Sequence, residues 1–365
     1  MIRWLTLALG VMCFGGLANA SDTVRVATYN AELFRDGPGL LLRDILKGKD
    51  AQVQAVVRVL QQTQPDILAV QGIDWDYDGL ALTAFADALR QAGVDYPHQF
   101  AARPNSGVAS GFDLDGDGRL GEPEDSLGFG EFTGQAGLAV LSRYPIAIED
   151  VQDFTGLLWR DLPGHSMPVL SNSDPFPSAE VQAMLPLSVS ALWAVPVQLP
   201  DDTTLTLLTF RASPPVFDGP EDMNGLRNLD ETRFWPLYLD GQFGPAPPDH
   251  FVLAGQINMD PHDSDGRADA LHALLADPRF QDPKPVSSGA ATARDQGHIS
   301  DNALDTVDWP GPGRLRVDYV LPSADWQVVN SGVHWPTPDQ PGYDDVVEAS
   351  RHRLVWVDLA AKPAP

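Results

Sequence analysis

Cysteine is almost absent from this chain: its 365 residues include one, Cys13. That residue lies in an apolar N-terminal stretch which we expect to be removed, so the mature protein should contain no cysteine. A framework of disulfides is therefore excluded. Stability must come from a large apolar core or from bound metal.

Long apolar runs are also missing after the N-terminus. Residues 1–20 contain a single charge, Arg3, then an apolar run from Trp4, and end in Ala18-Asn19-Ala20 before Ser21. This order is typical of a secretory signal peptide. We predict cleavage after residue 20, a secreted or periplasmic mature chain of one domain over residues 21–365, and no membrane insertion after cleavage. The apolar run is too short and too rich in glycine for a transmembrane helix.

Basic residues are scarce. The chain has 24 Lys plus Arg against 50 Asp plus Glu, a formal net charge of −26. Proteins that bind nucleic acid hold the phosphate backbone with clustered Lys and Arg, and no basic run occurs here. The composition therefore argues against a nucleic-acid partner, and the acidity is typical of a highly soluble protein.

Several apolar segments end abruptly in polar residues, as strands do when they deliver side chains to a site. An alternating strand is predicted from Val24 toward Asn30, and a buried strand over Ile67–Val70 is followed by Gln71-Gly72. The run Phe251–Ala254 leads into Gly255-Gln256-Ile257-Asn258. Helical spacing of apolar residues predicts helices over 50–62, 80–92 and 268–275, while 224–235 completes an insertion that leads into a helix.

Three further segments complete a recognisable series: Gly134–Ile146, Arg314–Ser323 and Ser350–Val357. Together with the strand ends above, they occur in the order found in the endonuclease/exonuclease/phosphatase family, which the chain resembles over nearly all of its mature length. The resemblance implies an α/β fold, a four-layer αββα sandwich in which two mixed sheets pack face to face with helices outside.

The resemblance also implies a phosphoester-hydrolase site with Mg²⁺ or Mn²⁺ held by Glu and Asp, and a His–Asp pair that handles the attacking water. Four family positions are retained and four are substituted. The retained residues are Asn30, Asn258, Asp318 and His352. The substituted positions carry Gly72 for Glu, Arg211 for His, Gln256 for Asp and Arg351 for Asp. A hard dication needs anionic oxygens, and Arg351 beside His352 is expected to disfavour the charged imidazole.

A second motif lies at 113–124, reading Asp-Leu-Asp-Gly-Asp-Gly-Arg-Leu-Gly-Glu-Pro-Glu. It matches the twelve-residue calcium loop of EF hands, in which the side chains at positions 1, 3, 5 and 12 and the carbonyl at position 7 hold the ion. These positions are Asp113, Asp115, Asp117, Glu124 and Arg119. No amphipathic helices flank the motif, so we predict an isolated structural Ca²⁺ site. An Asp- and Gly-rich surface turn without metal is the alternative.

Three functions remain open on this sequence. The first is a catalytically impaired homologue in which Arg211 and Arg351 bind phosphate or another anion without metal; salt bridges from these arginines to nearby acids are an equal alternative. The second is a metal-dependent phosphodiesterase or phosphatase that uses Asp74, Asp76 or Asp260 as substitute ligands. The third is a calcium-stabilised structural or adhesion scaffold.

Overall fold

The structure is a computed structural model that describes residues 23–293 and 295–362. The predicted signal peptide lies outside the described residues. Within the described part of the chain, no helix is long and apolar enough to cross a membrane.

Two mixed β-sheets form the centre of the molecule. One has six strands in the order β12-β13-β1-β2-β4-β3, and the other has five in the order β11-β8-β7-β6-β5. The β1–β2 and β7–β8 pairs are parallel and the remaining neighbours are antiparallel. A separate ribbon pairs β9 with β10. The strands are β1 (Val24–Leu33), β2 (Ile67–Ile73), β3 (His98–Phe100), β4 (Gly137–Ser142), β5 (Gln152–Asp153), β6 (Leu192–Gln198), β7 (Thr204–Phe210), β8 (Phe251–Gln256), β9 (Val307–Trp309), β10 (Gly313–Leu315), β11 (Asp318–Pro322), β12 (Trp326–Val333) and β13 (Val355–Ala361).

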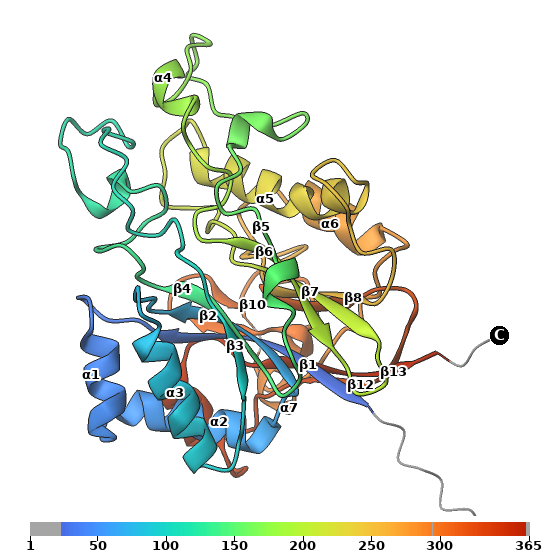
Figure 1. Ribbon diagram of the computed structural model, residues 1–365. Helices are drawn as coiled ribbons and strands as arrows, with labels where there is room; N and C mark the ends of the chain where they lie inside the picture. Colours follow the sequence, from blue (N-terminus) through green and yellow to red (C-terminus); the bar gives the residue numbers. More distant parts are fainter. Residues whose placement is uncertain (1–22, 294, 363–365) are drawn as a thin grey trace, which may run out of the picture.

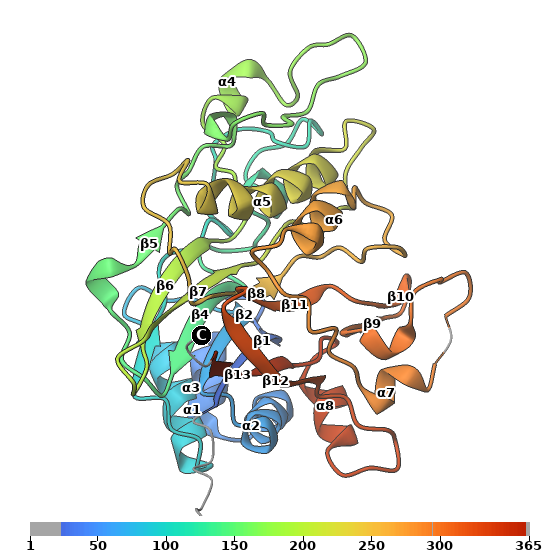
Figure 2. The same cartoon turned by 90° about the vertical axis from the view of Figure 1, so that its right-hand side faces the viewer.

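Helices cover the two outer faces. In Figure 1 and Figure 2, α1, α2 and α3 lie on the outer side of the six-stranded sheet, where α2 also packs against α8, and α5 and α6 lie over the other sheet. The helices are α1 (Leu40–Lys47), α2 (Ala51–Thr63), α3 (Leu80–Gln91), α4 (Ala179–Gln182), α5 (Met223–Leu239), α6 (Asp269–Ala276), α7 (Ser288–Ala291) and α8 (Tyr343–Ala349), with 3-10 turns η1 (Pro123–Asp125), η2 (Ile148–Asp150), η3 (Trp159–Asp161) and η4 (Asn302–Leu304). The predicted sandwich of two sheets with outer helices is confirmed.

The apolar core has two main parts, as this layering requires. Between the sheets, Val26 and Ala69 pack in one cluster with Trp193, Leu207 and Val252. Burial of this kind stabilises by about 25 cal/mol per Å² of apolar surface removed from water. A second cluster joins the outer face of the five-stranded sheet to α5 and α6. It contains Leu208, Phe210, Phe234, Trp235 and Tyr319.

Helix α5 differs from its prediction. The segment 224–235 was expected to complete an insertion before a helix, but α5 already begins at Met223 and runs to Leu239. Its buried residues include Arg227, Asn228 and Asp230. These polar side chains interrupt the apolar periodicity by which a buried helical face is recognised, so the pattern concealed the helix.

Candidate functional site

The ends of five strands bring the predicted residues into one layer between the sheets. In the six-stranded sheet, Asn30 on β1 is the register partner of Gln71 on β2. In the five-stranded sheet, Gln256 on β8 lies between Asp318 on β11 and Arg211, which follows β7. Register partners point to the same face of a sheet. Asn30 contacts Gln256 across the two sheets, so this layer lies at the interface between them.

A chain of amide hydrogen bonds runs through the layer. Asn30 donates from Nδ2 to Gln256 Oε1 at 2.7 Å, and Gln256 donates from Nε2 to Asn258 Oδ1 at 2.5 Å. Asn258 in turn donates from Nδ2 to the carbonyl of Ala212 at 2.7 Å. All three amides are almost fully buried. They satisfy one another and contribute no net charge.

Gly72 lies against Asn30, the first residue in this series of hydrogen bonds. Its φ is +68°, and a Cβ added there would lie 2.3 Å from Asn30 Oδ1. The space that a side chain at position 72 would enter is therefore filled by the Asn30 amide. A residue larger than glycine requires the amide to move.

The retained acid and histidine form a buried pair. His352 Nδ1 lies 2.9 Å from Asp318 Oδ2, and Thr306 Oγ1 donates to the same oxygen at 2.8 Å. The side chains of His352 and Asp318 are 3% and 0% exposed, so the pair is shielded from water. The other carboxylate oxygen, Asp318 Oδ1, is buried and has no hydrogen-bond partner among the described residues.

The side chain of Arg351 contacts an acid on β1. Its guanidinium turns away to Glu32, donating from Nε to Oε1 at 2.8 Å, while its backbone N–H donates to Oε2 at 2.8 Å. The hydrogen-bond partner of the His352 ring is the Asp318 carboxylate, and the expected effect of Arg351 on the charge of the ring stays a prediction. The alternative, a salt bridge from this arginine to an acid, is what the structure contains.

Glu32 is the site residue that the sequence reasoning missed. Its side chain is 12% exposed and lies at the end of β1, two residues after Asn30. Burial by itself would raise the pKa of this carboxyl, but hydrogen bonds from Arg351, helped by His352, hold the pKa below its ordinary value. The strand register shifts between Asn30 and Leu33, and Glu32 has a φ of +48°, so the regular alternation of a strand could not have placed this side chain.

Arg211 is held very differently. It donates from Nη1 to the carbonyl of Ala136 at 2.8 Å, and its buried Nε has no partner among the described residues. It forms no salt bridge with any described carboxylate. Burial lowers the pKa of this guanidinium, opposed by the charges of Glu231 and Glu32. The site therefore contains a cation without a contacting counter-ion.

The carboxylates considered as substitute metal ligands are already engaged. Asp74 accepts the N–H groups of Arg35 and Ala136 at 3.0 and 3.1 Å. Burial raises the pKa of Asp74 to about 6.

The other two substitutes are engaged in the same way. Asp76 accepts two N–H groups at the start of α3, both at 2.8 Å. Asp260 accepts the N–H groups of Arg316 and His262 at 2.9 and 2.8 Å. Backbone bonding of all three acids gives the substitute-ligand hypothesis no support.

A divalent metal does not fit this layer. Position 72 has no side chain, Gln256 is a neutral amide used by its neighbours, and Glu32 is neutralised by Arg351. Mg²⁺ requires anionic oxygens in near-octahedral geometry. In the described residues, the one cluster of three or more acidic, His or Cys groups at ligand spacing lies in the 113–124 loop.

That loop gathers its three aspartates but not its glutamate. Ligand oxygens of Asp113, Asp115 and Asp117 lie within 4.8 Å of one another, whereas Glu124 is exposed in η1 and stands outside this group. The neighbouring Asp125 accepts the N–H groups of Leu114 and Gly121 at 2.8 and 2.7 Å, which closes the loop. Arg119 donates its N–H to Asp117 at 2.8 Å.

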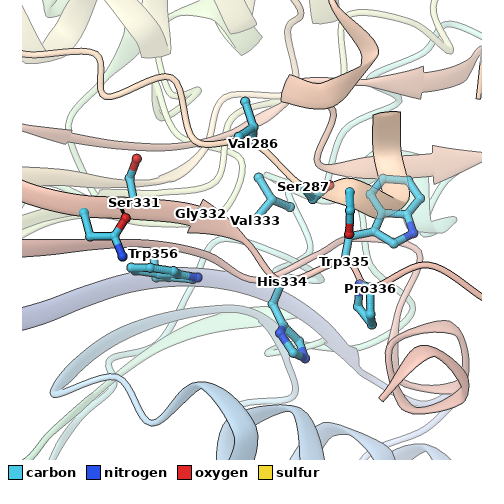
Figure 3. Close-up of a pocket in the computed structure, with 11 residues that line it drawn as sticks. Val286, Ser287, Ser331, Gly332, Val333, His334, Trp335, Pro336 and Trp356 are labelled. Carbon is cyan, nitrogen blue, oxygen red and sulfur yellow. Dashed lines mark hydrogen bonds between the residues drawn. The ribbon is translucent and has the colours of Figure 1, made fainter. Parts of the chain in front are cut away.

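A hollow of about 360 Å³ lies away from this layer, at the end of β12. Figure 3 shows Trp356, Gly332, His334 and Trp335 around it. The guanidinium of Arg25 lies 4.0 Å from the centre of the Trp356 ring, so one face of that ring is already covered. None of the predicted site residues lines this hollow.

Comparisons with known proteins agree with the geometry of the fold. A profile described as the Endonuclease/Exonuclease/phosphatase family matches residues 27–352. No curated protein matches the chain. Among solved structures, an endonuclease/exonuclease/phosphatase from Beutenbergia cavernae is 17% identical with a TM-score of 0.55, over 94% of this chain and 72% of that chain.

A family protein from Bacteroides thetaiotaomicron is 14% identical with a TM-score of 0.50, over 94% of this chain and 99% of that chain. At these identities the structural likeness supports the fold alone. The family follows from the profile match.

Helix α5 contains a buried acid, Glu231, whose charge acts on Arg211. Its protonation can be tested through the pH dependence of stability. Glu231 is 0% exposed and accepts the N–H groups of Ser213 and Val189 at 2.6 and 2.9 Å. Burial raises the pKa of Glu231 from 4.5 to about 7, opposed by the charge of Arg227. The folded protein therefore binds this proton more tightly than the unfolded chain does.

This residue should stabilise the fold fully below its unfolded pKa, and its contribution should be lost as the pH rises toward about 7. We expect the unfolding free energy of Glu231→Gln to vary less with pH across that window than the unfolding free energy of the wild type. Urea denaturation at a series of pH values measures the difference. The exposed Glu149→Gln is the control, and an unchanged slope in Glu231→Gln would contradict the assignment.

Proposed function

The chain belongs to the endonuclease/exonuclease/phosphatase family. Because Gly72, Gln256 and Arg351 stand at positions where the family resemblance implies acids, we propose that it is a catalytically impaired member. In this proposal the protein binds a phosphate ester or another anion at the strand ends without a divalent metal. The family's metal-dependent mechanism contributes no step here, because the residues present do not fit the ion.

The single observation that carries the proposal is Arg211. A buried charge is costly unless it is paired, and this guanidinium has one carbonyl contact and an unpartnered Nε. Arginine presents several donors in a planar fork that suits phosphate and carboxylate oxygens. An anion at this position satisfies both the charge and the free donor.

Arg351 supports anion binding in a different way from Arg211. By pairing with Glu32 it neutralises the nearest buried carboxylate on the β1 side of the layer. Without that pairing, Glu32 would repel an incoming anion. Its role in the proposal is therefore to remove negative charge, while Arg211 makes the direct contact.

Inorganic phosphate should bind to the mature protein in the presence of EDTA. Loss of a hydrogen bond to a charged group costs about 1.5–3 kcal/mol, so Arg211→Gln should weaken binding by about 10- to 100-fold. Isothermal titration calorimetry measures the affinity. The control is Arg90→Gln, which removes an exposed arginine paired with Asp87 and should leave binding unchanged. No heat with the wild-type protein would overturn the proposal.

One observation favours the second candidate, a metal-dependent phosphoester hydrolase: the Asp318–His352 pair is intact. Hydrolysis of a generic phosphodiester and a phosphomonoester, each with Mg²⁺, Mn²⁺ or EDTA, separates the two functions. We expect turnover at the level of the blank in every condition, since each lost catalytic group removes about 10²- to 10⁴-fold. EDTA-sensitive turnover that vanishes in His352→Ala would favour the hydrolase instead.

We also propose that the 113–124 loop binds a structural Ca²⁺ ion through Asp113, Asp115 and Asp117. The close approach of three carboxylates supports it, because like charges this near are stabilised by a shared cation. This site is also the basis of the third candidate, a calcium-stabilised scaffold with no ligand at the strand ends.

Calcium should raise the melting temperature of the mature protein relative to EDTA, because an ion that binds only the folded state stabilises that state. Thermal unfolding followed by circular dichroism measures the shift, which Asp115→Asn should reduce. The exposed Glu149→Gln variant should keep the full shift. Equal melting temperatures with calcium and with EDTA would contradict this proposal and favour a surface turn without metal.

A further inference from the structure

Ala136 connects a buried acid to the cation at the strand ends. Its N–H donates to Asp74 Oδ1 at 3.1 Å, and its carbonyl accepts from Arg211 Nη1 at 2.8 Å. The N–H and the carbonyl belong to the two peptide groups on either side of Ala136. The directions of both groups are therefore set together by the backbone angles of this one residue.

The backbone of Ala136 has a conformation that alanine rarely adopts. Its φ is +49°, in the left-handed region, where a residue with a Cβ is disfavoured and glycine is not. The hydrogen bond to Asp74 and the hydrogen bond from Arg211 hold the two sides of this strained residue. Because the same backbone angles direct both groups, each bond favours the geometry that the other needs.

Asp74 is itself fixed in place. The residue directly follows β2 and is 6% exposed, and its N–H donates to the carbonyl of Leu33 on β1 at 3.0 Å. Its second carboxylate oxygen, Oδ2, accepts the N–H of Arg35 at 3.0 Å. Both the backbone and the side chain of Asp74 are thus attached to the end of β1. The acid therefore provides a rigid support for the turn that contains Ala136 and leads into β4.

Two other acids compete for the Arg211 guanidinium. The charges of Glu231 and Glu32 both act on it. Glu231 already accepts two backbone N–H groups, and Glu32 accepts the side chain of Arg351. In the described part of the chain, neither acid forms a salt bridge with Arg211, whose printed hydrogen bond is the one to the Ala136 carbonyl. A guanidinium released from that carbonyl would be drawn toward these acids.

We infer, on the basis of the anion-binding function proposed above, that Asp74 is a positioning residue for the Arg211 guanidinium. It acts through Ala136: by accepting the N–H, Asp74 keeps this residue left-handed and its carbonyl directed at Arg211 Nη1. The guanidinium then stays apart from Glu231 and Glu32, and its Nε is free to donate to an anion. Asp74 makes no contact with the ligand.

Removal of the Asp74 carboxylate should weaken the binding of inorganic phosphate. Isothermal titration calorimetry with EDTA, at a pH well above the pKa of Asp74 of about 6, compares the wild-type protein with Asp74→Ala. We expect an affinity about 5- to 30-fold lower, the factor by which the left-handed conformation is disfavoured for a residue with a Cβ. Loss of a negative charge alone would strengthen anion binding, so the expected change is opposite to a simple charge effect.

The matched control is Asp76→Ala. It removes an acid of the same charge two residues away, which accepts two backbone N–H groups at the start of α3 and does not bond to Ala136. This variant should not weaken phosphate binding. Far-UV circular dichroism and thermal melting establish that each variant is folded.

A glycine at position 136 should rescue the loss. Glycine adopts positive φ about as readily as negative φ, so the carbonyl can point to Arg211 without the bond to Asp74. The double variant Asp74→Ala/Ala136→Gly should bind phosphate within about threefold of the wild-type affinity, and Ala136→Gly alone should bind as the wild type does. A role of Asp74 confined to stability would show no such rescue, because glycine does not replace the hydrogen bonds that Asp74 accepts.

Hydrogen exchange measured by NMR gives a second readout that needs no ligand. Arg211→Ala should speed the exchange of the Ala136 N–H, although Arg211 bonds to the carbonyl, because the left-handed conformation then loses one of its two supports. Arg90→Ala, which removes an exposed arginine paired with Asp87, should leave that exchange unchanged.

The outcomes separate the two claims. Phosphate binding by Asp74→Ala at the wild-type affinity, or binding by the double variant as weak as that of Asp74→Ala, would overturn the positioning role and leave Arg211 as an anion site. Unchanged exchange at Ala136 in Arg211→Ala would overturn that role as well. Absence of phosphate binding by the wild-type protein would overturn the proposed function, and the exchange experiment distinguishes that result from a failure of the coupling through Ala136.

Discussion

The hydrogen-bond chain from Asn30 through Gln256 and Asn258 to the Ala212 carbonyl is the constraint on which the site depends. It joins the two sheets at the point where the family resemblance implies a metal held by acids. A carboxylate can only accept hydrogen bonds, whereas the Gln256 amide accepts from Asn30 and donates to Asn258. The neutral Gln256 side chain thus links the hydrogen bonds on both of its sides. No cation is needed to hold the strand ends together.

The substitutions at positions 72 and 256 are structurally compatible with each other. Asn30 places Oδ1 in the space that a side chain at position 72 would take, and its Nδ2 bonds to Gln256. A glutamate at position 72 would displace the Asn30 amide and break the first link of the chain. An aspartate at 256 would bring a buried negative charge and supply no donor to Asn258. The two replacements therefore support one amide network.

The family resemblance, supported by the pattern of strands, predicted the architecture that the structure contains. The same resemblance assigned Asn30, Asn258, Asp318 and His352 to the site; the structure places them near one another, and their roles stay predictions. The direction of a long side chain cannot be read from the strand pattern. The Arg351 side chain was therefore expected beside His352, whereas it contacts Glu32. The start of helix α5 was predicted too late in the sequence. The helix buries charged residues on the face that usually carries apolar ones, so the apolar pattern did not mark its first turns.

The survival of the Asp318–His352 pair has a structural explanation that does not require hydrolysis. Thr306 donates to the same Asp318 oxygen as His352, and the Thr306 carbonyl accepts the N–H of Arg353. Next to it, the N–H of Asp308 donates to the carbonyl of Arg351. The pair therefore fastens the segment that leads into β13 onto β9 and β11. Removing either partner leaves a buried polar group unsatisfied, so this packing favours both residues whether or not a water is ever activated there.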